Sequence, residues 1–320
     1  MKSQDVYALH KAKKNKNDEF YTSLYDIDCE MKYYKNHFNN KIIFCPCDDS
    51  KESMFIKHFK DNFRKYNLKK LIGISYNPNG RAWKYEYVLD ENNNLKIIET
   101  ELNGNGDFRN EESSELLKQC NIVVTNPPFS LFRQFISWIV NENKDFIILG
   151  SVNAISFKEI FPLLKDNKMW LGKSIHSGDR EFRVPDSYGL NAAGCRIDSF
   201  GTKWIRVSGI RWFTNLDYKE RHEPIPLCKK YNLQQYPKYD NYDAINVDVT
   251  SDIPCDYDGV IGVPITYLDK HNPEQFKIIG SMASTTIDEY SKGYPYINGI
   301  KKYARILIQK NKEFDDELVW

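Results

Sequence analysis

The chain has 320 residues, of which 41% are hydrophobic, so it can bury one large core or two smaller ones. Gly and Pro, at 16 and 13 residues, are too sparse for a low-complexity or fibrous protein. The 45 Lys and Arg nearly balance the 44 Asp and Glu, so a polyanionic partner must be held by a local basic face rather than by net charge.

Residues 1–18 are polar and contain a short run of lysines that includes Lys14 and Lys16. We interpret this segment as a basic N-terminal arm. Such an arm can follow a DNA backbone, and a solvated terminus without a partner explains the same composition. The longest apolar stretches of the chain are far shorter than the roughly 20 residues of a bilayer span. No leader peptide opens the sequence, so we expect a cytoplasmic protein without a membrane segment.

Helical and β-type patterns alternate over the first half of the chain. Helical spacing of apolar residues predicts helices over residues 24–37, 52–66, 111–119 and 131–140. Short apolar runs predict strands over residues 41–45, 71–76, 95–102, 121–125 and 145–150, with a polar hairpin-like insertion after the second. This alternation is typical of a wound, largely parallel α/β sheet. Ligands of such sheets bind beyond the carboxyl ends of the strands, so the chemistry should lie just after Cys45, Tyr76, Leu102 and Thr125.

The texture of the sequence changes near residue 166. Shorter β-type pieces follow at residues 169–171, 180–184 and 203–213, and three late strands are predicted at residues 260–267, 276–279 and 304–308. We therefore expect a core over residues 19–166 and a second, β-rich region over residues 167–320. Six of the 11 arginines fall between residues 172 and 222 alongside aromatic residues, a composition suited to phosphate and base contacts. Ion pairs with the six acidic residues of the same stretch explain these arginines equally well.

The most specific segment is Asn126-Pro-Pro-Phe129, which follows an apolar strand and precedes an amphipathic helix. The prolines fix the backbone and lack N–H donors, so nearby carbonyls can face a ligand. The lone pair of an exocyclic purine amine is delocalised into the ring, and two acceptors bonded to its hydrogens would localise that pair for attack. The Asn126 side-chain oxygen and the Pro127 carbonyl could be these acceptors, Pro128 would stiffen the corner, and Phe129 offers a face for stacking.

This motif resembles the catalytic motif of S-adenosylmethionine-dependent DNA adenine methyltransferases. Further blocks, which begin at Asn17, Cys45, Trp212 and Tyr239, together resemble the EcoRI-type adenine methyltransferase family over nearly the whole chain. The resemblance implies a Rossmann-like methyltransferase sheet with an added mixed, β-rich DNA-recognition region. It also implies methyl transfer from S-adenosylmethionine to the amine of a flipped adenine in double-stranded DNA, in restriction-modification or DNA protection. The protein would act as a monomer, beside a restriction endonuclease with which it forms no complex.

The resemblance also assigns residues to roles. Asn126 would contact both the cofactor and the adenine. The other cofactor-binding residues would be Asn17, Phe20, Tyr21, Cys45, Cys47, Asp48, Asp49, Asp107 and Phe108. Glycines usual in the loop after the first strand are missing here, which suggests that Asp48 or Asp49 holds the cofactor ammonium by charge. Asp107 is also an ordinary turn residue. DNA would be bound by Arg180, Arg183, Arg206, Arg211, Lys14 and Lys16.

The cysteines argue against a metal site, and two alternative functions remain open. The seven cysteines are scattered and lack zinc-site spacing, so we expect reduced thiols and no metal site. A methyltransferase of the same fold acting on RNA or on a protein glutamine would meet the same lone-pair problem. The missing glycines also allow a DNA-binding protein without catalytic activity.

Overall fold

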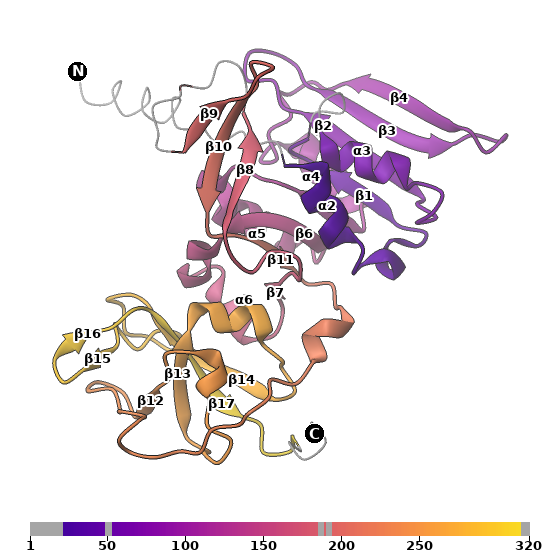
Figure 1. Ribbon diagram of the computed structural model, residues 1–320. Helices are drawn as coiled ribbons and strands as arrows, with labels where there is room; N and C mark the ends of the chain where they lie inside the picture. Colours follow the sequence, from indigo (N-terminus) through magenta and orange to yellow (C-terminus); the bar gives the residue numbers. More distant parts are fainter. Residues whose placement is uncertain (1–21, 49–52, 185–188, 190–193, 315–320) are drawn as a thin grey trace, which may run out of the picture. The chain divides into compact units, whose positions relative to one another are not determined.

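The computed structural model describes residues 22–48, 53–184, 189 and 194–314. The chain divides into two compact units of helices and strands (Figure 1). The first unit comprises the described residues up to Ala154 together with Ser177–Leu216. The second comprises Ile155–His176 and the described residues from Asp217 onward. The expected boundary between residues 166 and 167 does not coincide with these units, because the chain returns to the first unit between residues 177 and 216.

A large mixed sheet forms the centre of the first unit. Within this unit its strands follow the order β4-β3-β2-β1-β5-β6-β11. Strands β1, β2, β5 and β6 pair in parallel, and β4 points the same way because the β2–β3 and β3–β4 pairs are both antiparallel. The strands are β1 (Ile42–Cys45), β2 (Lys70–Ser75), β3 (Trp83–Leu89), β4 (Leu95–Glu101), β5 (Ile122–Thr125), β6 (Asp145–Ser151) and the antiparallel β11 (Ile210–Thr214).

Helices cover both faces of this sheet. Helix α3 connects β1 to β2, which is a step toward the β4 end of the sheet. Helix α4 connects β4 to β5, which is a step in the opposite direction. Because such crossover connections are right-handed, the two helices lie on opposite faces of the sheet. Adjacent residues of β11 show the two layers: the Trp212 ring lies 6.0 Å from Phe55 of α3, and the Phe213 ring lies 5.1 Å from Phe132 of α5. The helices are α2 (Leu24–Met31), α3 (Met54–Asp61), α4 (Glu111–Gln119) and α5 (Phe132–Asn141), with short 3₁₀ turns η1 (Lys35–Phe38), η2 (Phe129–Leu131) and η3 (Val152–Ser156).

A separate three-stranded antiparallel sheet also belongs to the first unit. Its order is β8-β10-β9, with β8 at Asp179–Arg183, β9 at Cys195–Ile197 and β10 at Lys203–Ser208. Strand β10 leads through Gly209 directly into β11 of the large sheet, and the Val152 N–H donates to the Gly209 carbonyl at that junction. The small sheet is therefore joined to the large sheet where β6 ends.

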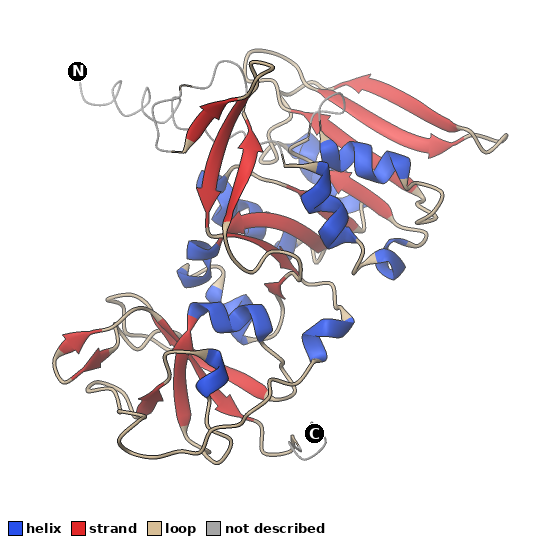
Figure 2. Ribbon diagram, in the orientation of Figure 1, coloured by secondary structure: helices blue, strands red, loops and turns tan. Residues whose placement is uncertain are grey.

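Short strands and long loops make up the second unit (Figure 2). Its four-stranded sheet has the order β12-β13-β17-β14, and α6 packs on β14. Buried Tyr239, Ala244, Met282, Ile297 and Leu307 form one of its hydrophobic clusters. The elements are α6 (Phe161–Lys165), β7 (Trp170–Leu171), η4 (Lys219–His222), β12 (Ala244–Asn246), η5 (Thr250–Asp252), β13 (Val260–Pro264), η6 (Ile265–Lys270), β14 (Phe276–Met282), β15 (Tyr296–Ile297), β16 (Ile300–Lys301) and β17 (Arg305–Lys310).

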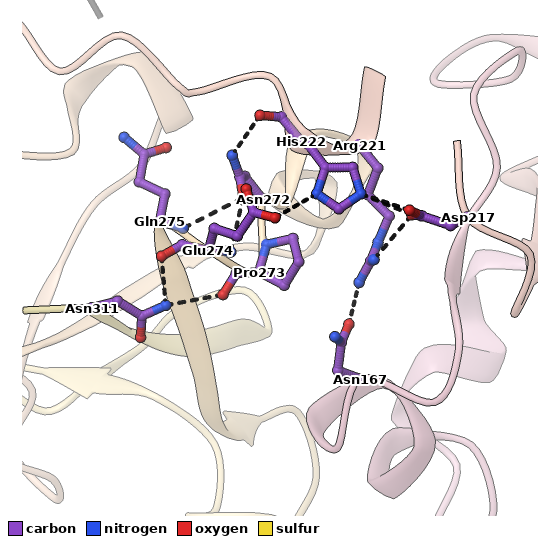
Figure 3. Close-up of polar contacts among 9 residues, drawn as sticks. All are labelled: Asn167, Asp217, Arg221, His222, Asn272, Pro273, Glu274, Gln275 and Asn311. Carbon is purple, nitrogen blue, oxygen red and sulfur yellow. Dashed lines mark hydrogen bonds and ion pairs between the residues drawn. The ribbon is translucent and has the colours of Figure 1, made fainter. Parts of the chain in front are cut away.

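A polar cluster in the second unit surrounds His222 (Figure 3). Its Nε2 lies 2.8 Å from the Asp217 carboxylate and its Nδ1 lies 2.8 Å from Glu274 Oε1. Burial alone would lower the pKa of His222, but these two carboxylates outweigh burial and raise it. The buried Arg221 guanidinium donates to Asn167 and lies 3.8 Å from the centre of the Trp170 ring. The cluster therefore ties η4 to segments that are distant in sequence.

The predicted elements are largely confirmed, with five corrections. The strand expected over residues 260–267 ends at Pro264 and is followed by η6, which begins at Ile265. The first helix ends at Met31 and is followed by η1, and the helix expected over residues 52–66 begins at Met54 and ends at Asp61. The hairpin-like insertion contributes β3 to the large sheet, so this sheet is mixed and not largely parallel. The run at residues 203–213 is two strands in different sheets, because Gly209 adopts a φ of +68° between them.

Candidate active site

The loops that follow β1, β2, β4 and β5 meet at one edge of the large sheet. These strands share one direction, so their carboxyl ends lie on the same side. The Asn77 N–H donates to the Asn105 carbonyl at 2.9 Å and joins the loops after β2 and β4. Thr125 Oγ1 donates to Asp48 Oδ2 at 2.5 Å and joins the loops after β5 and β1. The structure thus brings together the four positions at which the sequence predicted chemistry.

Asp48 lies at the centre of a buried hydrogen-bond network. Its Oδ2 accepts from Thr125, and its Oδ1 accepts from Ser53 Oγ at 2.7 Å. Ser53 is also the N-cap of α3, because its Oγ accepts from the N–H groups of Phe55 and Ile56. The side chain of Asp48 is only 8% exposed. Asp48 therefore connects the first turn of α3 to the strand end that carries Asn126.

This network bears on the predicted role of the loop after β1. The sequence suggested that Asp48 or Asp49 holds a cofactor ammonium, and in the structure each Asp48 oxygen accepts one hydrogen bond from within the protein. Asp49 lies outside the described residues. The N-cap of α3 is Ser53.

The thiols of the same loop are neutral at physiological pH. Burial raises the pKa of Cys45 well above its usual value, and the negative charge of Asp48 adds to the effect. Burial also raises the pKa of Cys47, with contributions from the charges of Asp48 and Asp107, although a hydrogen bond with Thr125 opposes them. Neither sulfur is therefore a thiolate nucleophile.

The loop after β4 is held tightly against β2. Gly106 has a φ of +76°, and an added Cβ would lie 2.8 Å from the Ser75 carbonyl oxygen and from side-chain carbons of Ile74 and Ala82. Only glycine fits this backbone path without displacement. The next residue, Asp107, accepts hydrogen bonds from the Arg109 backbone N–H at 2.9 Å and from Arg109 Nε at 2.8 Å. Burial would raise the pKa of Asp107, but the Arg109 hydrogen bonds outweigh it and lower that pKa.

Phe108 and Asp107 have diverging environments. Phe108 is 5% exposed, and its ring lies 5.0 Å from Phe135 and 5.4 Å from Trp138 of α5. Its ring is thus part of the core and presents little surface to a ligand. Asp107, which is partly exposed, keeps its carboxylate near the sheet edge, where Arg109 competes for it. The turn role and the ligand role considered for Asp107 both remain compatible with this geometry.

Asn126-Pro-Pro-Phe129 forms the expected corner between a buried strand and a helix. Every residue of β5 is buried, as is Pro127, whereas Asn126, Pro128 and Phe129 are half-buried. The Pro128 carbonyl accepts from the Leu131 N–H at 2.9 Å and starts η2, which continues into α5. The corner is thus fixed on one side by the sheet and on the other by the helix.

The three-stranded sheet separates the predicted DNA-binding arginines by face. In β10, Trp204 is paired with Arg183 and Arg196, and Arg206 is paired with Glu181, so these side chains share one face. Arg183, Arg196 and Arg206 are exposed. Arg196 makes a bidentate ion pair with Glu181 at 2.9 and 2.8 Å and lies over the Trp204 ring. Asp179 is paired with Ser208 and lies on the same face. We call this set the cationic face: Arg183, Arg196, Arg206, Trp204, Glu181 and Asp179.

Two of the predicted arginines lie elsewhere. Arg180 is paired with Val207 on the opposite face, and its Nε lies 3.5 Å from Asp26 Oδ1. Arg211 is a correction: it lies in β11 of the large sheet and is 4% exposed, so it does not suit a phosphate contact. Alternation along a strand decides both placements, and the composition of the stretch could not reveal it. Ion pairs with acidic residues of the same stretch, considered as the alternative, do occur at Arg196 and Arg221.

Several residues of interest escaped the sequence reasoning. Thr125 and Ser53 are small polar residues at a strand end and a helix start, and their contacts with Asp48 span up to 77 residues of sequence. The Ser beside a helical run was a usable capping signal. Asn17, Phe20, Tyr21, Lys14 and Lys16 lie outside the described residues. Among the residues that are described, no group of three or more His, Cys, Asp or Glu could hold a metal ion, and no helix is long and apolar enough to cross a membrane.

Comparison with known proteins identifies the family to which the sequence is similar. Residues 8–312 match the family described as adenine-specific methyltransferase EcoRI. The chain is 46% identical to Type II methyltransferase M.EcoRI of Escherichia coli over 319 residues, which cover 95% of this chain and 96% of that protein. It is 39% identical to Type II methyltransferase M.MgeORF184P of Mycoplasma genitalium over 325 residues, covering 96% and 100%. It is 36% identical to Type II methyltransferase M.MpnI of Mycoplasma pneumoniae over 327 residues, covering 96% and 99%.

No solved structure significantly matches the chain. The mixed α/β fold with its large mixed sheet is consistent with a methyltransferase. With a family match over nearly the whole sequence, the chain belongs to the EcoRI family of adenine-specific methyltransferases.

Proposed function

We propose that the protein transfers a methyl group from S-adenosylmethionine to the exocyclic amine of an adenine flipped out of double-stranded DNA. The observation that carries this proposal is the Asn126-Pro-Pro-Phe129 corner at the carboxyl edge of the sheet, tied to the neighbouring loop by the Thr125–Asp48 hydrogen bond. The family and the Type II names of the relatives support the same reaction.

The corner supplies hydrogen-bond acceptors at a fixed position. The Pro128 carbonyl is engaged by the Leu131 N–H, so the Asn126 side-chain oxygen and the Pro127 carbonyl are the two acceptors we assign to the adenine amine. Bonding both amine hydrogens localises the nitrogen lone pair for attack on the methyl carbon. The ring of Phe129 is the surface on which the base would stack. The amine proton becomes acidic only after methyl transfer, so no general base with a shifted pKa is needed.

The residues at the sheet edge fit a cationic cofactor. S-adenosylmethionine carries a sulfonium and an ammonium, and when bound it supplies the activated methyl group. The carboxylate of Asp107 lies at this edge, in the loop that follows β4. Strand β2 offers no acidic residue at its end. Its last residue, Ser75, donates through Oγ to the Trp83 carbonyl and accepts from the Trp83 N–H. We assign Asp107 and the backbone near Cys47 to the cofactor, and Asp48 to positioning the loop.

The cationic face is the surface that we assign to DNA. Three exposed arginines and one tryptophan share this face with Glu181 and Asp179, so it offers guanidinium groups for phosphate contacts in a protein whose net charge is only +1. It rises from the large sheet at the Gly209 junction, on the edge that carries the candidate active site. We propose that this small sheet belongs to the DNA-recognition region. The relatives are named Type II methyltransferases, so we place the protein in a restriction-modification system. We also propose that it acts as a monomer and forms no stable complex with the endonuclease.

Methyl transfer from labelled S-adenosylmethionine into duplex DNA, RNA and total protein tests the proposal. Incorporation into duplex DNA at adenine N6 is the expected result. Asn126→Ala should lower turnover about 10²–10³-fold while cofactor affinity, measured by calorimetry, changes little. Incorporation only into RNA or protein would refute the substrate, and no heat with the cofactor would favour a DNA-binding protein without activity.

A further inference from the structure

A short turn joins β9 to β10 in the small sheet (Figure 1), and it contains an exposed aromatic residue. Phe200 is 92% exposed, more than any other large hydrophobic residue in the described part of the chain, and Ile197 beside it is 55% exposed. Single exposed apolar residues are common on protein surfaces, so exposure alone carries no conclusion. The structure around Phe200 makes it unusual.

Asp198 holds this turn in one conformation. Its Oδ1 accepts from the backbone N–H groups of Phe200 and Thr202, both at 2.9 Å. Its Oδ2 accepts from Trp204 Nε1 at 2.8 Å, and Gly201, with a φ of +81°, closes the turn. The position of Phe200 is therefore set before any partner binds, so little conformational freedom of the turn would be lost on insertion.

The same turn continues the cationic face. Trp204, which donates to Asp198, also lies beneath the Arg196 guanidinium. The six residues of β10 place the turn about 20 Å from the Gly209 junction at about 3.3 Å per residue. A duplex lying along the cationic face would therefore contact the arginines through its backbone, while the tip of the turn reaches a groove about 8 Å deep.

We infer that Phe200 is a wedge that enters the duplex at the target adenine and stacks in the position which the flipped base leaves. This inference rests on the proposed function, because it requires a base to be flipped. Apolar side chains that insert between base steps are a known way to deform DNA. An aromatic ring in the vacated position would replace part of the stacking that is lost when adenine leaves the helix. Phe200 would thus be a positioning residue rather than a catalytic one.

The test requires the recognition site, which sequencing of methylated adenines in DNA from cells expressing the chain would supply. A duplex with 2-aminopurine at that adenine then reports unstacking by fluorescence. The wild-type complex should become fluorescent, Phe200→Ala should reduce the flipped fraction and the single-turnover rate about tenfold or more, and Phe200→Trp should retain both. Tyr303→Ala, which removes an 89% exposed aromatic residue from the second unit, is the matched control and should behave as wild type.

A duplex with a mismatch at the target adenine distinguishes a wedge role of Phe200 from a role in DNA binding alone. A mismatch lowers the cost of unpairing, so the defect of Phe200→Ala should shrink on that duplex. Fluorescence and rates of Phe200→Ala within twofold of wild type would overturn the wedge while leaving the proposed function intact. An equal defect on matched and mismatched duplexes would also overturn it. If the wild-type protein itself neither methylates DNA nor unstacks the 2-aminopurine, the proposed function fails, and the wedge fails with it.

Discussion

Thr125→Val tests whether the link between the β1 and β5 loops organises the site. The substitution keeps the shape of the side chain but removes the donor to Asp48, in a setting where Thr125 is 0% and Asp48 is 8% exposed. Hydrogen bonds to ionised groups contribute about 1.5–3 kcal/mol, and the substitution removes one such bond from the buried carboxylate while the bond from Ser53 remains. A loss of about 2 kcal/mol in a unit of this size corresponds to a fall in Tm of roughly 4–8 °C.

The same substitution should also slow catalysis, because Thr125 directly precedes Asn126. A displacement of about 1 Å at a reacting group can cost about 10²-fold, so we expect kcat to fall roughly 10–100-fold. Thr214→Val is the matched control. Thr214 is equally buried and donates at 2.7 Å to the neutral Phe146 carbonyl, but it lies at the opposite edge of the sheet. The Thr214→Val enzyme should lose about 0.5–1.5 kcal/mol of stability and keep the kcat of the wild type.

A double-mutant cycle decides the cause. If the bond to the Asp48 carboxylate is what matters, Thr125→Val should cost much less when Asp48 is already Asn. Urea unfolding of the four proteins measures the coupling, which we expect to be at least about 1 kcal/mol. Costs that add within about 0.5 kcal/mol, or a Thr125→Val enzyme with unchanged kcat, would refute the reasoning.

Three further predictions concern other parts of the chain. The pKa of His222 is raised above its usual 6.5, because its two carboxylate partners outweigh burial. The stabilisation from protonated His222 is therefore fully present below about pH 6.5, and it disappears as the pH rises through the folded-state pKa. The Tm difference between wild type and His222→Gln should therefore shrink with rising pH, and a difference that grows would contradict the assignment. Arg206→Gln should reduce the slope of log DNA affinity against log salt by about 1, whereas Arg180→Gln, on the other face, should leave the slope unchanged; equal slopes for all three proteins would remove Arg206 from the interface. Gly201→Ala should cost about 1 kcal/mol from backbone strain alone, because nothing lies within 4 Å of an added Cβ. Gly106→Ala should cost about 1–3 kcal/mol more, since its Cβ would meet three atoms at 2.8 Å, and similar Tm values for the two variants would show that the β4 loop yields easily.

Long-range contacts account for most of the differences between the predicted and the observed site. Asp48 is an acidic residue in a cofactor loop, and its type alone suggested a bond to an ammonium. In the structure its two oxygens accept from Ser53 and from Thr125, which is 77 residues away. Phe108 next to Asp107 suggested a ring against a ligand, but packing against α5 buries it. In both cases a partner distant in sequence determined where the side chain lies.

The arginines show the same limit. A stretch rich in arginine identified a basic region, but one glycine, Gly209, ends one strand and begins another in a different sheet. Arg206 and Arg211 therefore lie in different environments, one exposed and the other buried, although they are five residues apart.

The sequence by itself determined the alternation of helices and strands, the carboxyl edge as the place for chemistry, and the Asn126-Pro-Pro-Phe129 corner with its family. These depend on local periodicity and on residues that are adjacent in the chain. Only the tertiary structure decided which side chains share the edge, which arginines face outward, and how β3 and β11 enter the large sheet. Pairing register and burial depend on the whole fold, because a residue's face is fixed by the strand beside it and not by its own neighbours in sequence.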